Sequence, residues 1–246
     1  MRDTIKNRKH FDRLHSHFSA LFNEWYDEYL KIKNGENTTG AKIDGYCGSM
    51  VLDFQRVFYL EYSMGLPKIE LTKNQHILFE ALLGYWTAKS GAYNYIFFVL
   101  CYAIIFNIPK DEITPVLDLL TKENYKDFVL DSMANYLIPD FEVRTEELKF
   151  RKSTKPVAEV IELAQMDKSK AVKRLKHYLE KEWFNMRKDG LMHNKSHLMD
   201  EKKHYVYLGY WCIEAATLVI MFDLDDTILK DCKYYPYDLV HGQSHS

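Results

Sequence analysis

The side chains best suited to chemistry in this chain are two aspartates and a threonine near its C-terminus, Asp223, Asp225 and Thr227. They directly follow the apolar stretch Val219-Ile-Met-Phe222. Carboxylates two residues apart can share a phosphoryl transfer, in which the first attacks phosphorus as a nucleophile and the second acts as general acid and base. The spacing therefore raises the hypothesis of a phosphohydrolase that uses Asp223 and Asp225.

This arrangement resembles the nucleophile loop of the haloacid-dehalogenase phosphatases, where the loop follows a buried strand and later strands supply the remaining catalytic groups. Only 19 residues follow Thr227, which leaves no room for those strands. The preceding apolar residues recur at spacings of three and four: Trp211, Ala215, Leu218 and Phe222. That period is typical of a helix. We therefore interpret residues 223–226 as the polar end of a helix, assign no catalytic residue, and keep the phosphohydrolase as an alternative.

Two further kinds of side chain could do chemistry. Glu214 lies in the middle of the same apolar pattern, and a buried carboxylate needs a partner, so we expect an internal ion pair there. His193 and His197 are four residues apart, with His204 following, which invites a zinc site. No acidic third ligand is fixed by that spacing. We therefore predict a solvated loop with no metal and no cofactor.

The composition limits the partners of the chain. The formal net charge is only -2 in 246 residues, whereas nucleic-acid-binding domains are usually strongly basic. One helix segment does carry a cluster of basic residues: Lys168, Lys170, Lys173, Arg174 and Lys176. Such a cluster is ordinarily a solvated helix face. We therefore expect no direct contact with nucleic acid.

Several features indicate a cytoplasmic protein without a membrane segment. The first ten residues lack the apolar core of a signal peptide. The apolar run over residues 92–106 is shorter than the roughly 20 residues needed to span a bilayer, so we predict a buried central helix. The four cysteines are widely separated: Cys47, Cys101, Cys212 and Cys232. We expect buried free thiols, with neither disulfides nor zinc.

The apolar spacing predicts an all-α fold, a compact multi-helix bundle of two packed helical halves, residues 1–140 and 141–246. Glycine and proline are scarce (10 and 6 residues), and no useful stretch alternates between apolar and polar residues, which disfavours strands. A capping box at residues 72–75 and the pair Thr114-Pro115 each predict a helix start. The charged segment 141–155 is predicted to be a linker. Other helices are expected over residues 11–32, 43–58, 92–106, 125–137, 157–164, 172–186 and 198–222.

Three motifs in the C-terminal region together resemble the PoNi family of immunity proteins. They are Gly209-Tyr210-Trp211-x-x-Glu214-Ala215, the pair Asp225-Asp226, and Tyr235-Pro236-Tyr-Asp238-Leu-Val. The upstream stretch 178–190, a helix with a late tryptophan, is also similar to that family. The resemblance is specific over residues 178–240 and looser in the N-terminal part. One departure is Cys212-Ile213, where a small polar residue and an aromatic one are expected, and it affects packing more than function.

The resemblance implies a cytosolic, all-helical immunity protein that binds and neutralises a cognate PoNe-type DNase toxin used in interbacterial competition. Such toxins are similar to PD-(D/E)xK nucleases, whose metal-dependent site must accept DNA. An inhibitor can block such a site by presenting carboxylates and aromatic rings to a basic cleft, and charge complementarity speeds the encounter. A helical scaffold or adaptor protein with another partner is the remaining alternative.

The aspartates and tyrosines of the C-terminal stretch are the candidate toxin-binding residues: Asp223, Asp225, Asp226, Asp231, Tyr234, Tyr235 and Asp238. Each has a structural alternative, in which Asp225 or Asp226 caps a short helix, Asp238 holds the Tyr-Pro-Tyr turn and the tyrosines pack the tail onto the body. The residues shared with the family are expected to maintain the fold: Gly209, Tyr210, Trp211, Glu214, Ala215 and Pro236. The identity of the toxin, the blocked surface and the oligomeric state stay open.

Overall fold

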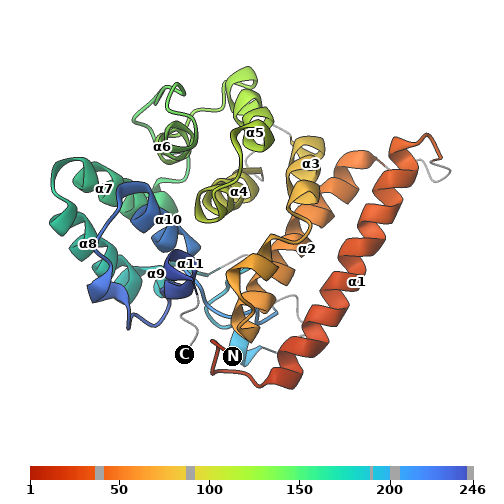
Figure 1. Ribbon diagram of the computed structural model, residues 1–246, viewed down its shortest axis with the longest axis horizontal. Helices are drawn as coiled ribbons and strands as arrows, with labels where there is room; N and C mark the ends of the chain where they lie inside the picture. Colours follow the sequence, from red (N-terminus) through yellow and green to blue (C-terminus); the bar gives the residue numbers. More distant parts are fainter. Residues whose placement is uncertain (37–41, 87–91, 189–190, 200–205, 243–246) are drawn as a thin grey trace.

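Helices make up the regular structure of the chain (Figure 1). The computed structural model describes residues 1–36, 42–86, 92–188, 191–199 and 206–242, and within these ranges no strand forms. The prediction of an all-α fold is therefore confirmed.

The first half begins with two long helices that pack side by side, and shorter helices follow (Figure 1). Its elements are α1 (Arg8–Lys33), α2 (Ile43–Met64), the 3-10 helix η1 (Lys68–Thr72), α3 (Gln75–Tyr85), α4 (Tyr93–Phe106), α5 (Lys110–Lys122) and α6 (Phe128–Leu137). The second half contains α7 (Arg151–Met166), α8 (Lys168–His177), the π-helix η3 (Tyr178–Glu182), α9 (Trp183–Met186), η4 (Ser196–Leu198), α10 (Ile213–Phe222), η6 (Thr227–Leu229) and α11 (Tyr237–His241).

Helix α4 forms the centre of the molecule, as its apolar sequence predicts. It packs against α10 from the second half and against α2, α3 and α6 from the first. Most of its side chains are buried, for example Ile96, Val99 and Leu100 at 0% exposure. Among the helices of the described residues, none has both the length and the apolar character that crossing a membrane requires.

The helix predicted over residues 198–222 is wrong for residues 206–212, and residues 200–205 of that prediction lie outside the described ranges. Residues 206–212 are not helical, and α10 begins only at Ile213. Gly209 has φ +99°, a conformation that a helix excludes and that glycine adopts at little cost. The open backbone lets Tyr207 donate to Asp3 at 2.5 Å, so contacts with the N-terminus outweigh the local helical pattern.

Two helix starts and the linker also differ from the prediction. Thr72 donates to the carbonyl of Ile69 instead of capping a helix, and Asn74 precedes α3. Helices α5 and α7 each begin upstream of a proline, at Lys110 and Arg151, so the charged linker is partly helical. Proline removes one intrahelical hydrogen bond, and the buried apolar faces of both helices offset that loss.

The N-terminal residues join the two halves. The Arg2 guanidinium donates to Asp238 at 2.6 Å and to the carbonyls of Tyr62 and Leu66 at 2.9 Å. It also lies over the Tyr62 ring, 4.3 Å from its centroid. The start of the chain therefore lies beside α11, which Figure 1 shows.

A thiol reagent is expected to modify Cys232 well before the other cysteines of the folded protein. All four cysteines are free, and Cys47, Cys101 and Cys212 are buried while Cys232 is half-buried. Burial raises the pKa of Cys47 to about 11 and that of Cys101 further, which suppresses the reactive thiolate. Mass spectrometry should detect one modified thiol per native chain and four after denaturation. Rapid native modification of a buried cysteine would contradict this prediction.

Candidate functional site

Three exposed carboxylates line the loop that follows α10, and we call Asp223, Asp225 and Asp231 the acidic loop. Asp223 ends α10 in the left-handed conformation, and its side chain is fully exposed. Lys168 at the start of α8 donates to the Asp223 carbonyl at 3.3 Å, with its ammonium 3.8 Å from the carboxylate. The acidic loop therefore lies against α8 and extends its charges into solvent.

Local hydrogen bonds and two leucines fix the shape of the acidic loop. Asp225 accepts from the Thr227 hydroxyl at 2.5 Å and from the Thr227 backbone N–H at 3.1 Å. These two bonds lower the pKa of Asp225, so this carboxylate stays charged at neutral pH. Leu224 and Leu229 are buried on either side. The charges are thus presented from an anchored segment.

Asp226 and Tyr235 lie inside the protein, which corrects their prediction as toxin-facing residues. Asp226 is 6% exposed and Tyr235 4%. The Tyr235 hydroxyl donates to Asp226 at 2.5 Å, and the His241 Nε2 lies 2.9 Å from the same carboxylate. Burial and the neighbouring carboxylate raise the pKa of Tyr235. The contacts of Tyr235 and His241 with Asp226 therefore hold α11 against the acidic loop.

Asp238 and Tyr234 are half-buried and hold the tail to the body. Asp238 is the partner of Arg2. The Tyr234 ring stacks on Phe184, with centroids 5.1 Å apart and an interplanar angle of 7°, and its carbonyl accepts from the Cys212 N–H at 2.9 Å. These contacts explain why both side chains lie against the body of the protein. Both residues follow the acidic loop in the sequence, and each is partly exposed.

Glu214 forms the internal ion pair that its position in the sequence predicts. It is 3% exposed and accepts from Arg187 at 2.5 Å, Trp183 at 2.9 Å and Tyr178 at 3.0 Å. Burial acts to lower the pKa of Arg187, yet the Glu214 charge keeps that pKa above its usual value. The cluster joins α10 to the π-helix and α9.

The shared motif residues Tyr210 and Trp211 contact other segments of the chain. The Tyr210 hydroxyl lies 2.8 Å from His197 Nδ1 and donates to the His193 carbonyl at 3.2 Å. Trp211 donates to the Ser63 hydroxyl at 2.8 Å. Two others are simply buried, Ala215 within α10 and Pro236 just before α11.

The histidines predicted to lie in a solvated loop are partly engaged in structure. Residues 196–198 form only a short 3-10 turn, so His193 and His197 do not share the face of an α-helix. His204 lies outside the described residues. Within the described part of the chain, no three potential metal ligands come together.

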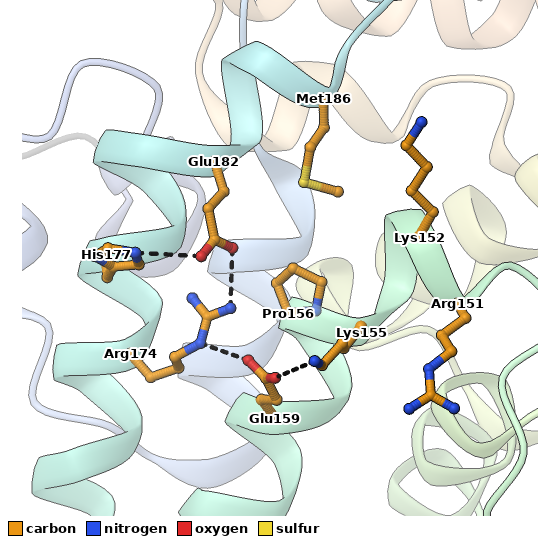
Figure 2. Close-up of a pocket in the computed structure, with 9 residues that line it drawn as sticks. All are labelled: Arg151, Lys152, Lys155, Pro156, Glu159, Arg174, His177, Glu182 and Met186. Carbon is orange, nitrogen blue, oxygen red and sulfur yellow. Dashed lines mark hydrogen bonds and ion pairs between the residues drawn. The ribbon is translucent and has the colours of Figure 1, made fainter.

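A cleft of about 840 Å³ lies between α7 and the α8–η3 segment (Figure 2). Its lining residues are mostly charged: Arg151, Lys152, Lys155, Pro156, Glu159, Arg174, His177, Glu182 and Met186. Arg174 donates to Glu159 at 2.7 Å and to Glu182 at 2.9 Å. The sequence assigned Arg174 to a solvated face, but it is largely buried here. In the sequence, the four-residue spacing of Arg151, Lys155 and Glu159 indicates that α7 has a charged face.

Comparison with known proteins identifies the second half of the chain. Residues 125–239 match the family model of the PoNe immunity proteins (PoNi), C-terminal domain. We call residues 125–239 the PoNi region after this similarity. The PoNi region contains the acidic loop, the Glu214 cluster and the α7–α8 cleft. Neither the curated proteins nor the solved structures include a match to the chain.

The structure of the PoNi region is incompatible with a phosphatase nucleophile loop at Asp223. That loop follows a buried strand, whereas Val219 to Phe222 are the last residues of α10. Asp223 itself is fully exposed to solvent and does not line the α7–α8 cleft. The Asp-x-Asp spacing therefore arises from a helix end and the turn after it.

Proposed function

We propose that this chain is the immunity protein of a PoNe-type DNase toxin, which it binds and neutralises in the cytoplasm of the cell that makes it. The PoNi match over residues 125–239 carries this proposal. The partner is then a protein, and the chain acts by binding, without catalysis and without a cofactor.

The acidic loop is the surface that we propose to block the nuclease. A nuclease site must attract the phosphates of DNA, so it is expected to be rich in lysine and arginine. Asp223, Asp225 and Asp231 offer such a site three negative charges in solvent. The buried leucines and the Asp225–Thr227 bonds preorganise this loop, which reduces the entropy lost on binding.

The decisive experiment mixes the purified chain with the purified nuclease domain encoded beside it. We expect binding in calorimetry and loss of DNA cleavage at a molar excess of the chain. If the nuclease keeps its full activity and no binding is measured, the proposal fails.

Neutralising the acidic loop is expected to slow association with the toxin. The triple variant Asp223→Asn, Asp225→Asn and Asp231→Asn keeps side-chain size, and asparagine at position 225 can still accept the Thr227 bonds. We expect the association rate to fall roughly tenfold at low salt. The difference should shrink towards 1 M salt, because the Debye length drops from about 10 Å at 0.1 M to about 3 Å. Stopped-flow fluorescence measures both rates.

A matched control removes three exposed carboxylates from the first helix and the residues after it. Glu24, Asp27 and Glu36 are exposed, and α1 lies on the opposite side of the molecule from α8 (Figure 1). The variant Glu24→Gln, Asp27→Asn and Glu36→Gln changes the net charge equally and should bind at nearly the native rate. Equal slowing in both variants would assign the effect to net charge and remove the acidic loop from the proposed interface.

A further inference from the structure

The α7–α8 cleft holds more positive than negative charge. Its two acidic side chains are already engaged, because Glu159 and Glu182 both accept from Arg174, and Lys155 and His177 lie within 3.6 Å of them. Arg151 and Lys152 also line the cleft, are exposed, and form no ion pair with the described residues. Two cations are therefore available to an incoming acid.

The same cleft has an apolar part. Pro156 is buried in its wall, and Figure 2 shows the Met186 side chain pointing into the space between η3 and α7. Met side chains adapt to varied apolar partners. Cations beside an apolar surface suit a peptide that carries both carboxylates and an apolar side chain.

The wall formed by η3 has two features that are unusual for a purely structural element. Residues 178–182 form a π-helix, a rare conformation that is frequent at functional sites. It buries Tyr178 and Leu179 while Glu182 turns towards Arg174. The Arg174 Nη1 atom is buried and has no hydrogen-bond acceptor among the described residues. The guanidinium therefore has unused donor capacity within the cleft wall.

We propose that the α7–α8 cleft receives an acidic, partly apolar peptide segment of the toxin, with its carboxylates beside Arg151 and Lys152 and an apolar side chain against Met186. This inference rests on the proposed function and adds a second contact to it. Helix α8 connects the two surfaces, because Arg174 lines the cleft and Lys168 contacts Asp223 of the acidic loop.

Nucleic acid fits this cleft less well than an acidic peptide. Affinity for DNA depends on many cations that neutralise successive phosphates. Here the carboxylates of Glu159 and Glu182 lie among the cations and would repel a continuous polyanion. A peptide can instead place single carboxylates beside the two unpaired cations.

The test reverses the charges of Arg151 and Lys152 and compares this variant with a control variant. The cleft variant is Arg151→Glu with Lys152→Glu, at the first two residues of α7. The control is Arg8→Glu with Lys9→Glu, at the first two residues of α1. Both pairs are exposed and undergo the same change in charge at the same helical positions. The control pair differs in that Arg8 also loses an exposed ion pair with Asp12. Glutamate is favourable in the first turn of a helix, so both variants should fold, which circular dichroism checks.

Calorimetry against the purified toxin domain should show a Kd at least roughly tenfold higher for the cleft variant and nearly native for the control. Carbodiimide, which joins amines to carboxylates in contact, should cross-link Lys152 but not Lys9 to the toxin.

Equal affinities in the two variants would overturn the cleft proposal while leaving the immunity function intact. Failure of the native chain to bind the toxin would instead remove both. A labelled duplex of about 20 base pairs that binds the native chain but not the cleft variant would assign the cleft to nucleic acid and overturn the peptide proposal.

Discussion

Replacing Glu214 by alanine should lower the free energy of unfolding by about 3–5 kcal/mol, the usual cost of breaking a buried ion pair from one side. The change leaves Arg187 without its carboxylate and leaves the buried Trp183 and Tyr178 donors without an acceptor. A buried polar group without a partner itself costs about 1–3 kcal/mol. Urea denaturation followed by tryptophan fluorescence measures the loss.

Two control variants separate the causes of that loss. Glu214→Gln retains an acceptor oxygen and removes only the charge, so it should be less destabilising than alanine. Glu162→Ala removes an exposed glutamate from α7 and should change stability by no more than about 0.5 kcal/mol. A loss below about 1 kcal/mol for Glu214→Ala would mean that the ion pair contributes little beyond its own desolvation cost.

Burial of Glu214 could be predicted because its neighbours in its own helical pattern are apolar, whereas the partners that it binds come from the π-helix, α9 and the residue after α9. The same holds for α4, whose apolar sequence on every face specifies a central helix without reference to its neighbours. Both predictions depend on local periodicity, and both were confirmed. The division at residue 140 stays a prediction, and the PoNi match begins upstream of it, at residue 125.

The separate roles of neighbouring aspartates could not be predicted from their sequence. Asp225 is exposed while Asp226 is buried, because the partners of Asp226 come from Tyr235 and His241 in the following turn and helix. The spacing of carboxylates indicates possible chemistry, but the contacts made by later residues decide which carboxylate reaches solvent. This is why the candidate surface reduces to the acidic loop.

The α7–α8 cleft was missed for a related reason. Its charges come from two helices, and each helix taken alone looks like a solvated basic face. The π-helix that turns Glu182 towards Arg174 leaves no recognisable sequence pattern. Only the packing of α7 against α8 brings the glutamates to Arg174 and leaves Arg151 and Lys152 unpaired.

Gly209→Ala is the second substitution expected to have a large effect, about 3 kcal/mol of lost stability from overpacking and a broken hydrogen bond. A Cβ atom at this position would lie 2.1 Å from the Ser63 hydroxyl and 2.6 Å from Trp211 Nε1. These two atoms are hydrogen-bonded to each other, so the methyl group would separate them. The positive φ of +99° adds backbone strain that alanine does not tolerate.

Gly45→Ala provides the control for this effect. Gly45 lies in the first turn of α2, and a Cβ atom there would meet nothing within 4 Å. Alanine favours helix, so this variant should be stabilised by about 0.5–1 kcal/mol. Opposite signs for the two substitutions in thermal denaturation would show that the close contacts and the positive φ of position 209, and not glycine replacement as such, cause the loss. Because Ser63 lies in α2 and Trp211 in the PoNi region, a loss below about 1 kcal/mol would mean that this contact contributes little to joining the two halves.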